Sequence, residues 1–372
     1  MIDVVWDMET GDPDDFLTLL LLLGHPQVNL KAVAVTPGTP DQVGVVRRAL
    51  EWFGRDIPVG AHNLDHQPRS VREREDPVEG RHGPRGVCVS SWHYKAYGDI
   101  PSSRDAAPGG EVLHAHCDES TTLVTGAPLK NLGAALRLPN FRVGRLVVQG
   151  GFAGEGVVPP ERQLGKFRGL VTCPTYNLNG DPRSAEAALV HPGIGVRRFV
   201  SKNVCHGVYY DADMHAAVAA VKHRSPSLQR IWQGMEVYLD KSPEGKKFHD
   251  PLAACCAIDE SIGEWAEVEL FRARGGWARA RARARTRGSS PATTTTASCA
   301  RCWPRAPTLL SEGTGRNRCA RGRRSPRHAH APTIARDVLT SHAGRRSREA
   351  PQPRTHVAAT RRSLRVPTST IA

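Results

Sequence analysis

Five acidic side chains crowd a stretch of nine residues near the N-terminus: Asp7, Glu9, Asp12, Asp14 and Asp15. A largely apolar run precedes this stretch and another follows it, so we expect a buried strand, an acidic loop and then a helix. In parallel α/β sheets, ligands bind beyond the carboxyl ends of the strands. Carboxylates this close repel one another unless a cation compensates them, so the loop predicts a divalent-metal or catalytic site.

Helix capping is the alternative explanation of this acidic loop. Asp12, Asp14 and Asp15 lie where acidic side chains cap a helix and complement its dipole. Capping accounts for only one or two of the acids, so we favour the metal or catalytic site.

Two later clusters carry polar side chains at expected helix starts. Asp250 and Pro251 precede an apolar run, which indicates a helix N-terminus, and a plain N-cap explains this Asp equally well. Before Asp181, we expect a short extended segment that presents Asn177 and Asn179 on one face. Asparagine often occupies turns for backbone reasons, but two amides on one face could also bind sugar hydroxyls.

The coarse pattern of the chain is an alternation of strands and helices. Such alternation predicts an α/β fold with a mostly parallel central sheet and helices on both faces. The expected strands are residues 4–6, 30–36, 58–60, 121–124, 145–150 and 196–200, and the expected helices are 14–23, 40–53, 109–116, 129–138 and 182–191. Residues 211–258 have apolar side chains at helical spacing, so we expect helices over the rim of the sheet.

Composition divides the chain near Arg272. The formal net charge of +14 combines about +19 from residues 273–372, which contain no lysine, with −5 from residues 1–272. We therefore expect one domain over residues 1–272 and an Arg/Ala/Ser/Thr/Pro-rich tail over 273–372 that is disordered. The tail also uses amino acids with GC-rich codons, as expected if a GC-rich gene were read out of frame there.

The longest apolar stretch, residues 16–24, is too short to span a bilayer, and no signal peptide precedes the first strand. We therefore expect a cytoplasmic protein with no membrane partner and with reduced cysteines. The basic tail gives non-specific electrostatics, but no folded nucleic-acid module accompanies it, so we expect no specific nucleic-acid partner.

Short motifs, in order along residues 1–272, resemble those of the inosine-uridine nucleoside hydrolase family. The family's DxDxxxDD signature is similar to Asp7-x-Glu9 followed by Asp14-Asp15, with one residue inserted and Glu in place of the second Asp. Six more motifs follow: Thr36-Pro37-Gly38-Thr39, Gly80-Arg81-His82-Gly83, Thr125 to Asn131, Gln149-Gly150-Gly151, Tyr176-Asn177 with Asp181-Pro182, and His249-Asp250-Pro251.

The resemblance implies hydrolysis of the N-glycosidic bond of ribonucleosides by a calcium-bound water, which releases base and ribose. Calcium accepts six to eight oxygen ligands in irregular geometry, which suits a site built from scattered carboxylates. The implied calcium ligands are Asp7, Glu9, Asp15, Asp250 and the main-chain oxygen of Gly126, or of Thr125 if the turn aligns differently.

The resemblance also implies roles toward the substrate. Glu9 would act as the general base, and His249 would protonate or shield the leaving base. Ribose or pocket contacts would come from Asp14, Thr39, His82, Asn177 and Asn179. The family's habit of forming dimers and tetramers implies a homodimer or a homotetramer.

Two departures from the family pattern favour a weakened or substrate-shifted relative as one alternative. Glu9 is one methylene longer than Asp, and Thr175 replaces an acidic ribose ligand, for which Asn179 would substitute as a donor. A different class is a haloacid-dehalogenase-type phosphatase, in which Asp7 is the nucleophile and magnesium the ion. That alternative leaves Asp14, Asn177 and the His249 motif unexplained.

Overall fold

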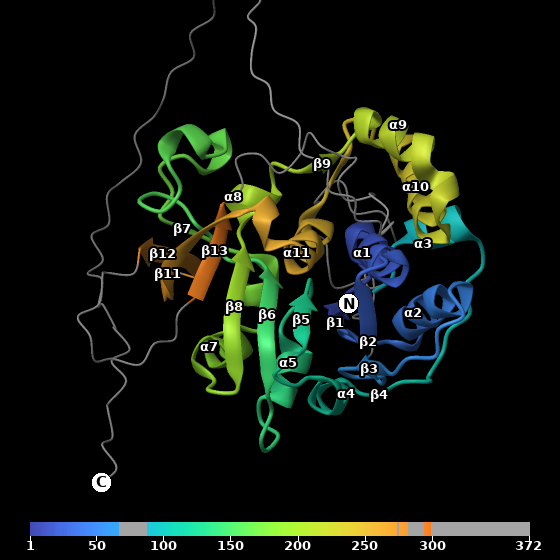
Figure 1. The fold of residues 1–372 in the computed structure, drawn as a ribbon, viewed down its shortest axis with the longest axis horizontal. Coiled ribbons are helices and arrows are strands. Elements are labelled where there is room, and N and C mark those ends of the chain that lie inside the picture. Colours follow the sequence, from blue (N-terminus) through green and yellow to red (C-terminus); the bar gives the residue numbers. More distant parts are fainter. Residues whose placement is uncertain (67–87, 274, 282–293, 299–372) are drawn as a thin grey trace, which may run out of the picture. The chain divides into compact units, whose positions relative to one another are not determined.

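The computed structural model describes residues 1–66, 88–273, 275–281 and 294–298 (Figure 1). All of them belong to Met1–Thr314, the first of the two compact units into which the chain divides. Within this described part, eleven strands form the main sheet, in the order β4-β3-β2-β1-β5-β6-β8-β13-β11-β12-β7. Neighbours from β4 to β13 pair in parallel, and the last three pairings are antiparallel. The predicted mostly parallel α/β sheet is confirmed.

The strands that form the parallel part are shortest at the β4 edge and include all six predicted strands. They are β1 (Ile2–Met8), β2 (Val28–Val35), β3 (Val59–Ala61), β4 (Ala107–Pro108), β5 (Thr122–Thr125), β6 (Val143–Gln149), β8 (Ile194–Val200) and β13 (Thr294–Ser298). The antiparallel edge contains β11 (Glu264–Ala273), β12 (Gly276–Arg281) and β7 (Thr172–Cys173). A separate two-stranded sheet pairs β9 (Tyr209–Tyr210) with β10 (Lys246–Lys247).

Helices follow most of the parallel strands. They are α1 (Pro13–Gly24), α2 (Pro40–Trp52), α3 (Ser91–Tyr97), α4 (Gly109–His116), α5 (Lys130–Ala135), α6 (Tyr176–Gly180), α7 (Pro182–Val190), α8 (Lys202–Cys205), α9 (Ala212–Val221), α10 (Pro226–Leu239) and α11 (His249–Ile258). Helix α10 packs on α1 and α3, and α11 packs on β5, β6 and α1.

Strand β1 separates two hydrophobic cores because its side chains alternate between the faces of the sheet. Val4, Trp6 and Met8 belong to the core that α1, α2, α10 and α11 cover. Val5 belongs to the opposite core, under α4, α5 and α7. Figure 1 shows these two helix layers on opposite sides of the sheet. The same alternation directs Asp7 toward the face of Val5, away from the side on which α1 lies.

One expectation about local structure is wrong. Asn177 and Asn179 lie in the short helix α6 rather than on an extended segment, so they do not share a face. The Asp-Pro pair that follows starts α7 as expected, with Asp181 accepting a hydrogen bond from the backbone of Ser184 at 3.2 Å. Helix α6 is only five residues long, so the sequence offers no hydrophobic period by which to recognise it.

The sheet also continues beyond the boundary that composition indicates at Arg272. Strands β12 and β13 come after it, and β13 pairs in parallel with β8 and antiparallel with β11. The rest of the tail, residues 274, 282–293 and 299–372, lies outside the described residues, so the division into a domain and a disordered or out-of-frame tail stays a prediction.

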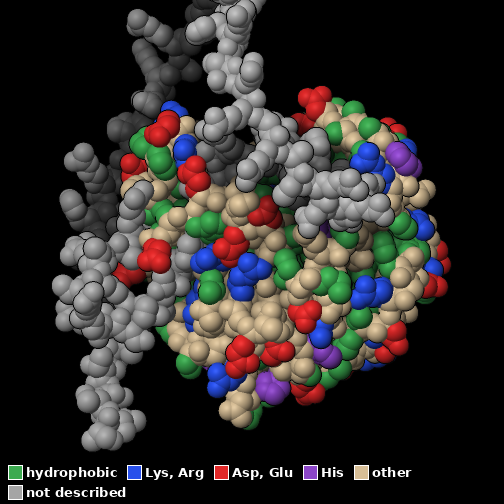
Figure 2. Space-filling view, viewed as in Figure 1, with side chains coloured by type: hydrophobic (Ala, Val, Ile, Leu, Met, Phe, Trp, Pro, Cys, Tyr) green, Lys and Arg blue, Asp and Glu red, His purple; other side chains and the backbone are tan. Residues whose placement is uncertain are grey.

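On the face seen in Figure 2, acidic and basic side chains of the described residues are interspersed among apolar ones. This mixture agrees with the small net charge of residues 1–272. None of the described helices is both long enough and apolar enough to cross a membrane.

Candidate functional site

Asp14 connects the acidic loop to the late His-Asp-Pro motif. Its side chain leaves the first turn of α1, and its Oδ2 accepts hydrogen bonds from the backbone N–H of His249 at 3.1 Å and of Asp250 at 3.4 Å. These N–H groups open α11, where the first turn of a helix has no partner of its own. A carboxylate on α1 therefore fixes the start of α11 beside the acidic loop.

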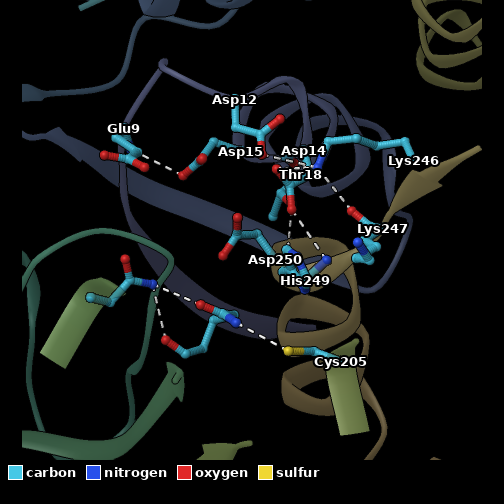
Figure 3. Close-up of polar contacts among 12 residues, drawn as sticks. Glu9, Asp12, Asp14, Asp15, Thr18, Cys205, Lys246, Lys247, His249 and Asp250 are labelled. Carbon is cyan, nitrogen blue, oxygen red and sulfur yellow. Dashed lines mark hydrogen bonds and ion pairs between the residues drawn. The ribbon is translucent and has the colours of Figure 1, made fainter. Parts of the chain in front are cut away.

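Three buried carboxyl groups meet at this junction. Asp14, Asp15 and Asp250 offer oxygen atoms that all lie within 4.8 Å of one another. Figure 3 shows the carboxyl groups of Asp15 and Asp250 pointing to the same side, with Glu9 beside Asp15. Oδ1 of Asp250 is buried and has no hydrogen-bond partner among the residues that the structure describes. An unpartnered buried carboxylate oxygen is costly, so the arrangement suits a bound cation.

Burial has the largest effect on the pKa values of these three carboxyl groups. It raises the pKa of Asp15 well above 3.8, and Asp250 and Glu9 raise it further. Burial also raises the pKa of Asp250, with Asp14 adding to the effect. Asp14 differs: burial acts to raise its pKa, but Lys246 and His249 together lower it. Without a cation the group therefore holds protons that a divalent ion would displace.

Gly126 makes room for Asp250. It follows β5, and its backbone N–H donates to the carbonyl of Asp7 at 2.9 Å. A Cβ atom at this position would lie 2.5 Å from Oδ1 of Asp250 and 2.7 Å from the Trp6 ring. Only glycine fits here, because both neighbours are packed into the core.

Glu9 and Asp7 are not members of the group within 4.8 Å. The backbone N–H of Glu9 donates to Oδ1 of Asp15 at 3.0 Å, which holds the loop against α1. Asp7 is fully buried and accepts from Nδ2 of Asn131 at 2.9 Å, on the far face of β1. Burial raises the pKa of Asp7 to about 7. The structure therefore separates Asp7 from the predicted metal ligands Asp15 and Asp250.

Lys246 is the residue of the site that the sequence did not reveal. Its buried ammonium lies 3.1 Å from Oδ1 of Asp14 and 3.1 Å from Oδ2 of Asp12. Asp12 makes no side-chain cap for α1, so pairing with Lys246 replaces capping. Lys246 stands three residues before His249, but a lone lysine on a strand has no pattern that marks it.

Asn177 connects indirectly to His249. Its Nδ2 donates to the backbone oxygen of Gln149 at 3.0 Å and to Oε1 of Gln149 at 2.8 Å. Nε2 of Gln149 donates in turn to Sγ of Cys205 at 3.2 Å. Cys205, His206 and His249 have ligand atoms within 4.8 Å of one another. Gln149 was part of a predicted motif, but no role was assigned to its side chain.

The side chains of the other predicted substrate contacts form hydrogen bonds within the fold or lie outside the described residues. Asn179 Nδ2 donates to the backbone oxygen of Gly275 at 2.7 Å, and its Oδ1 accepts from the backbone of Thr175. The Thr39 hydroxyl caps α2 in a capping box with Gln42. His82 lies outside the described residues.

His249 is neutral at physiological pH. Burial lowers its pKa to about 4, against an opposing effect of Asp14. The neighbouring ring of His206 lies 4.6 Å away between centroids, and burial together with His249 lowers the pKa of His206 to about 3. The Nδ1 atom of His249 is buried and has no hydrogen-bond partner in the described part of the chain. The fold of this part therefore leaves one nitrogen of the imidazole uncommitted.

Comparison with known proteins adds to this geometry. The family model described as inosine-uridine preferring nucleoside hydrolase matches residues 4–309. An uncharacterised protein of Aquifex aeolicus is 25% identical over 276 residues, which cover 72% of this chain and 85% of that protein. The pyrimidine-specific ribonucleoside hydrolase RihA of a Shewanella strain is 29% identical over 175 residues. This match covers 44% of the chain and 52% of RihA, so the chain spans about half the length of this named relative.

Solved structures show the same fold. A plant nucleoside hydrolase, the PpNRh1 enzyme, aligns with a TM-score of 0.58 at 19% identity, over 81% of this chain and 95% of that one. An inosine-uridine preferring nucleoside hydrolase from Bacillus anthracis aligns with a TM-score of 0.54 at 17% identity, over 80% and 94%. The family match confirms the resemblance and leaves the phosphatase alternative without support. The chain belongs to the inosine-uridine preferring nucleoside hydrolase family, whose members are glycosidases that act on N-glycosyl bonds.

Proposed function

We propose that this chain hydrolyses the N-glycosidic bond of ribonucleosides and that the acidic group holds a calcium ion for this reaction. The observation that carries the proposal is the buried group of Asp14, Asp15 and Asp250, with an unpartnered oxygen on Asp250. Calcium suits such a group because it takes only oxygen ligands and tolerates irregular geometry. Glu9, whose backbone N–H donates to Asp15, and the main-chain oxygen of Gly126, a residue that lies against Asp250, complete the proposed ligand set.

When bound, the ion would supply positive charge that orients the ribose hydroxyls and lowers the pKa of an attacking water. Residues of the chain itself accept the proton, bind the ribose and stabilise the transition state. Glu9, beside Asp15, accepts the proton of the water. Asn177 holds the ribose, and Asp14 fixes its orientation. Asp250 and Asp15 keep negative charge near the ribose, where an oxocarbenium-like transition state becomes positive.

His249 acts in this scheme as a neutral hydrogen-bond donor to the leaving base. A pKa of about 4 leaves it unprotonated near neutral pH. Its backbone N–H is bonded to Asp14, which fixes the ring relative to the acidic group. A neutral donor stabilises negative charge on a departing base without delivering a full proton, so bases with poor leaving ability should depend on it most.

A weakened, nucleoside-binding relative is the second candidate. The observation that favours it is the contact between Lys246 and Asp14, because this ammonium occupies one oxygen of the carboxylate proposed to orient the ribose. Such a protein would bind nucleosides but turn them over slowly.

Ribose release from inosine, uridine, cytidine and adenosine, with calcium and with a chelator, tests the proposal. We expect release from at least one nucleoside with calcium and none with the chelator. Binding of a nucleoside without release would favour the second candidate, and release that is indifferent to the chelator would exclude the calcium site.

A further inference from the structure

Three ammonium groups gather beside the candidate site. Lys166 lies in the 3₁₀ turn Gly165–Phe167, Lys202 opens α8, and Lys247 lies on β10. Their charges act on one another: burial lowers the pKa of Lys166, and Lys247 and Lys202 lower it further. Lys246 has two acidic partners, whereas no ion pair to any of the other three occurs in the part of the chain that the structure describes.

Aromatic rings hold these three side chains in place. The ammonium of Lys166 lies 5.1 Å from the centroid of Phe167, and that of Lys202 lies 5.9 Å from the same ring. Lys247 lies 5.7 Å from the ring of Tyr209. Cation–π contacts at such distances restrict long side chains before any ligand arrives, which reduces the entropy lost on binding.

The three lysines lie near His249, to which the proposed function assigns the leaving base, or near the segment before Asn177, and the charge of Lys247 acts on His249. Lys166 donates to Nδ1 of His206 at 2.8 Å, and the His206 ring contacts His249. Lys202 donates to the carbonyl of Pro174 at 2.9 Å. The next residue is Thr175, whose buried hydroxyl has no hydrogen-bond partner within the described ranges.

The charges of the whole site are therefore divided between two ends. One end has the buried carboxyl groups of Asp14, Asp15 and Asp250. The other has the ammonium groups of the three lysines, which have no acidic partner among the described residues. A matching ligand has hydroxyls at one end and an anion at the other. Lysines bind phosphate as point charges, and phosphate is the anion commonly attached to ribose.

A soft metal ion is a competing occupant of the same region, because Cys205, His206 and His249 lie within reach of one ion. Two observations oppose it. Lys166 already occupies Nδ1 of His206. The ammonium groups of Lys166, Lys202 and Lys247 all act on His206, so they would repel a second cation there.

We propose that Lys166, Lys202 and Lys247 form a phosphate subsite and that the preferred substrates of this chain are ribonucleoside 5′-monophosphates. The proposal rests on the proposed function, in which the carboxylate end holds two ribose hydroxyls and so leaves the 5′ oxygen to carry the phosphate. In the reaction the C1′–N bond breaks and a C1′–O bond forms from water. The base leaves with one proton of that water, and the sugar product is ribose 5-phosphate.

The test compares kcat/KM for uridine and its 5′-monophosphate in the full-length protein and in two variants, Lys166→Gln and Lys247→Gln. We expect the parent to favour the monophosphate. Each variant should lower kcat/KM for the monophosphate about tenfold more than for uridine, as expected for the loss of one charge-assisted contact. The control Lys31→Gln, at a half-exposed lysine paired with Asp3, should leave that ratio unchanged.

Binding measured calorimetrically in the presence of calcium decides the subsite even if no substrate is cleaved. Ribose 5-phosphate should bind the parent more tightly than ribose or inorganic phosphate does, and Lys166→Gln should remove the difference. A parent that cleaves uridine at least as well as the monophosphate would overturn the proposal while leaving the proposed function intact. Equal binding of inorganic phosphate and ribose 5-phosphate would also overturn it, because the lysines would then bind any free anion.

Discussion

Asp14, Asp15 and Asp250 determine the character of the site at the scale of single residues. Their carboxyl groups are buried, and Asp14 alone has a full set of partners, in Lys246 and the start of α11. The other two are stabilised by protonation or by a cation. The three residues therefore have two different functions. Asp14 holds α1, β10 and α11 together, whereas Asp15 and Asp250 stay available to a ligand.

Asp7 gives a pH-dependent prediction. Its folded pKa of about 7 exceeds the ordinary 3.8, so its contribution to stability is fully present below pH 3.8 and is lost as the pH rises through 7. Asp7→Asn should therefore stabilise the metal-free protein at pH 8, by up to about 4 kcal/mol. The gain should vanish toward pH 4. Thermal unfolding of both proteins in chelator from pH 4 to pH 8 measures it.

Calcium titration of the same variant tests whether Asp7 is a ligand. The structure ties Asp7 to Asn131, so we expect Asp7→Asn to retain calcium binding. A variant that no longer binds calcium would return Asp7 to the ligand set implied by the family resemblance.

Gly126 gives a steric prediction. Gly126→Ala places a Cβ 2.5 Å from Oδ1 of Asp250, so this carboxyl group must move. We expect calcium affinity to fall at least tenfold and stability to fall by about 1–3 kcal/mol, the usual cost of overpacking. Gly165→Ala is the matched control, because nothing lies within 4 Å of a Cβ there. Unchanged calcium affinity in Gly126→Ala would show that the position of Asp250 is not critical.

At the scale of elements, β10 holds α1 and α11 together. Lys246, on β10, pairs with Asp12 before α1 and with Asp14 inside it, and Asp14 accepts from the backbone of α11. A short strand far along the chain therefore supports the acidic loop. We therefore expect the conformation of the acidic loop to depend on the buried charge of Lys246.

Lys246→Met should destabilise the metal-free protein by about 3–5 kcal/mol, because it leaves Asp14 buried without its counter-ion. Calcium should recover more stability in this variant than in the parent, since a cation replaces the lost charge. Thermal unfolding with and without calcium measures both effects. Lys31→Met breaks a half-exposed pair and should cost at most about 1 kcal/mol. Equal losses in the two variants would contradict the role of Lys246.

The sequence predicted those site residues that are marked by the pattern of their immediate neighbours. Asp15 and Asp250 were recognisable because each lies just before an apolar run that indicates the start of a helix. Lys246 was not, since its partners are more than two hundred residues away in the sequence. Strand β13 was missed because its threonine run lies in an arginine-rich tail, although threonine favours strands.

At the scale of the whole molecule, β13 connects the two halves of the sheet. It pairs with β8 on one side and β11 on the other, so without it two strand edges have no partner. A chain ending at Thr314 should unfold at the same temperature as the full chain, whereas one ending at Arg281 should lose at least 10 °C or fail to fold. Thermal unfolding of the two truncated chains tests this.

Equal stability of these two truncated chains would mean that β13 contributes nothing to the sheet. Loss of stability in the chain ending at Thr314 would contradict the proposal that the far tail is dispensable. Comparing the two truncated chains therefore shows which part of the tail contributes to the stability of the fold.

The central claim is that one calcium ion binds at this acidic group, to Asp15 and Asp250, and supports hydrolysis. The most direct measurement is a calcium titration of the chelated protein, followed in parallel by calorimetry and by ribose release. We predict one site in the parent, with half-maximal release at the calcium concentration that half-fills it. Asp250→Asn should lose both binding and release, and the control Asp213→Asn, on the exposed start of α9, should lose neither. Full ribose release by Asp250→Asn would contradict the account.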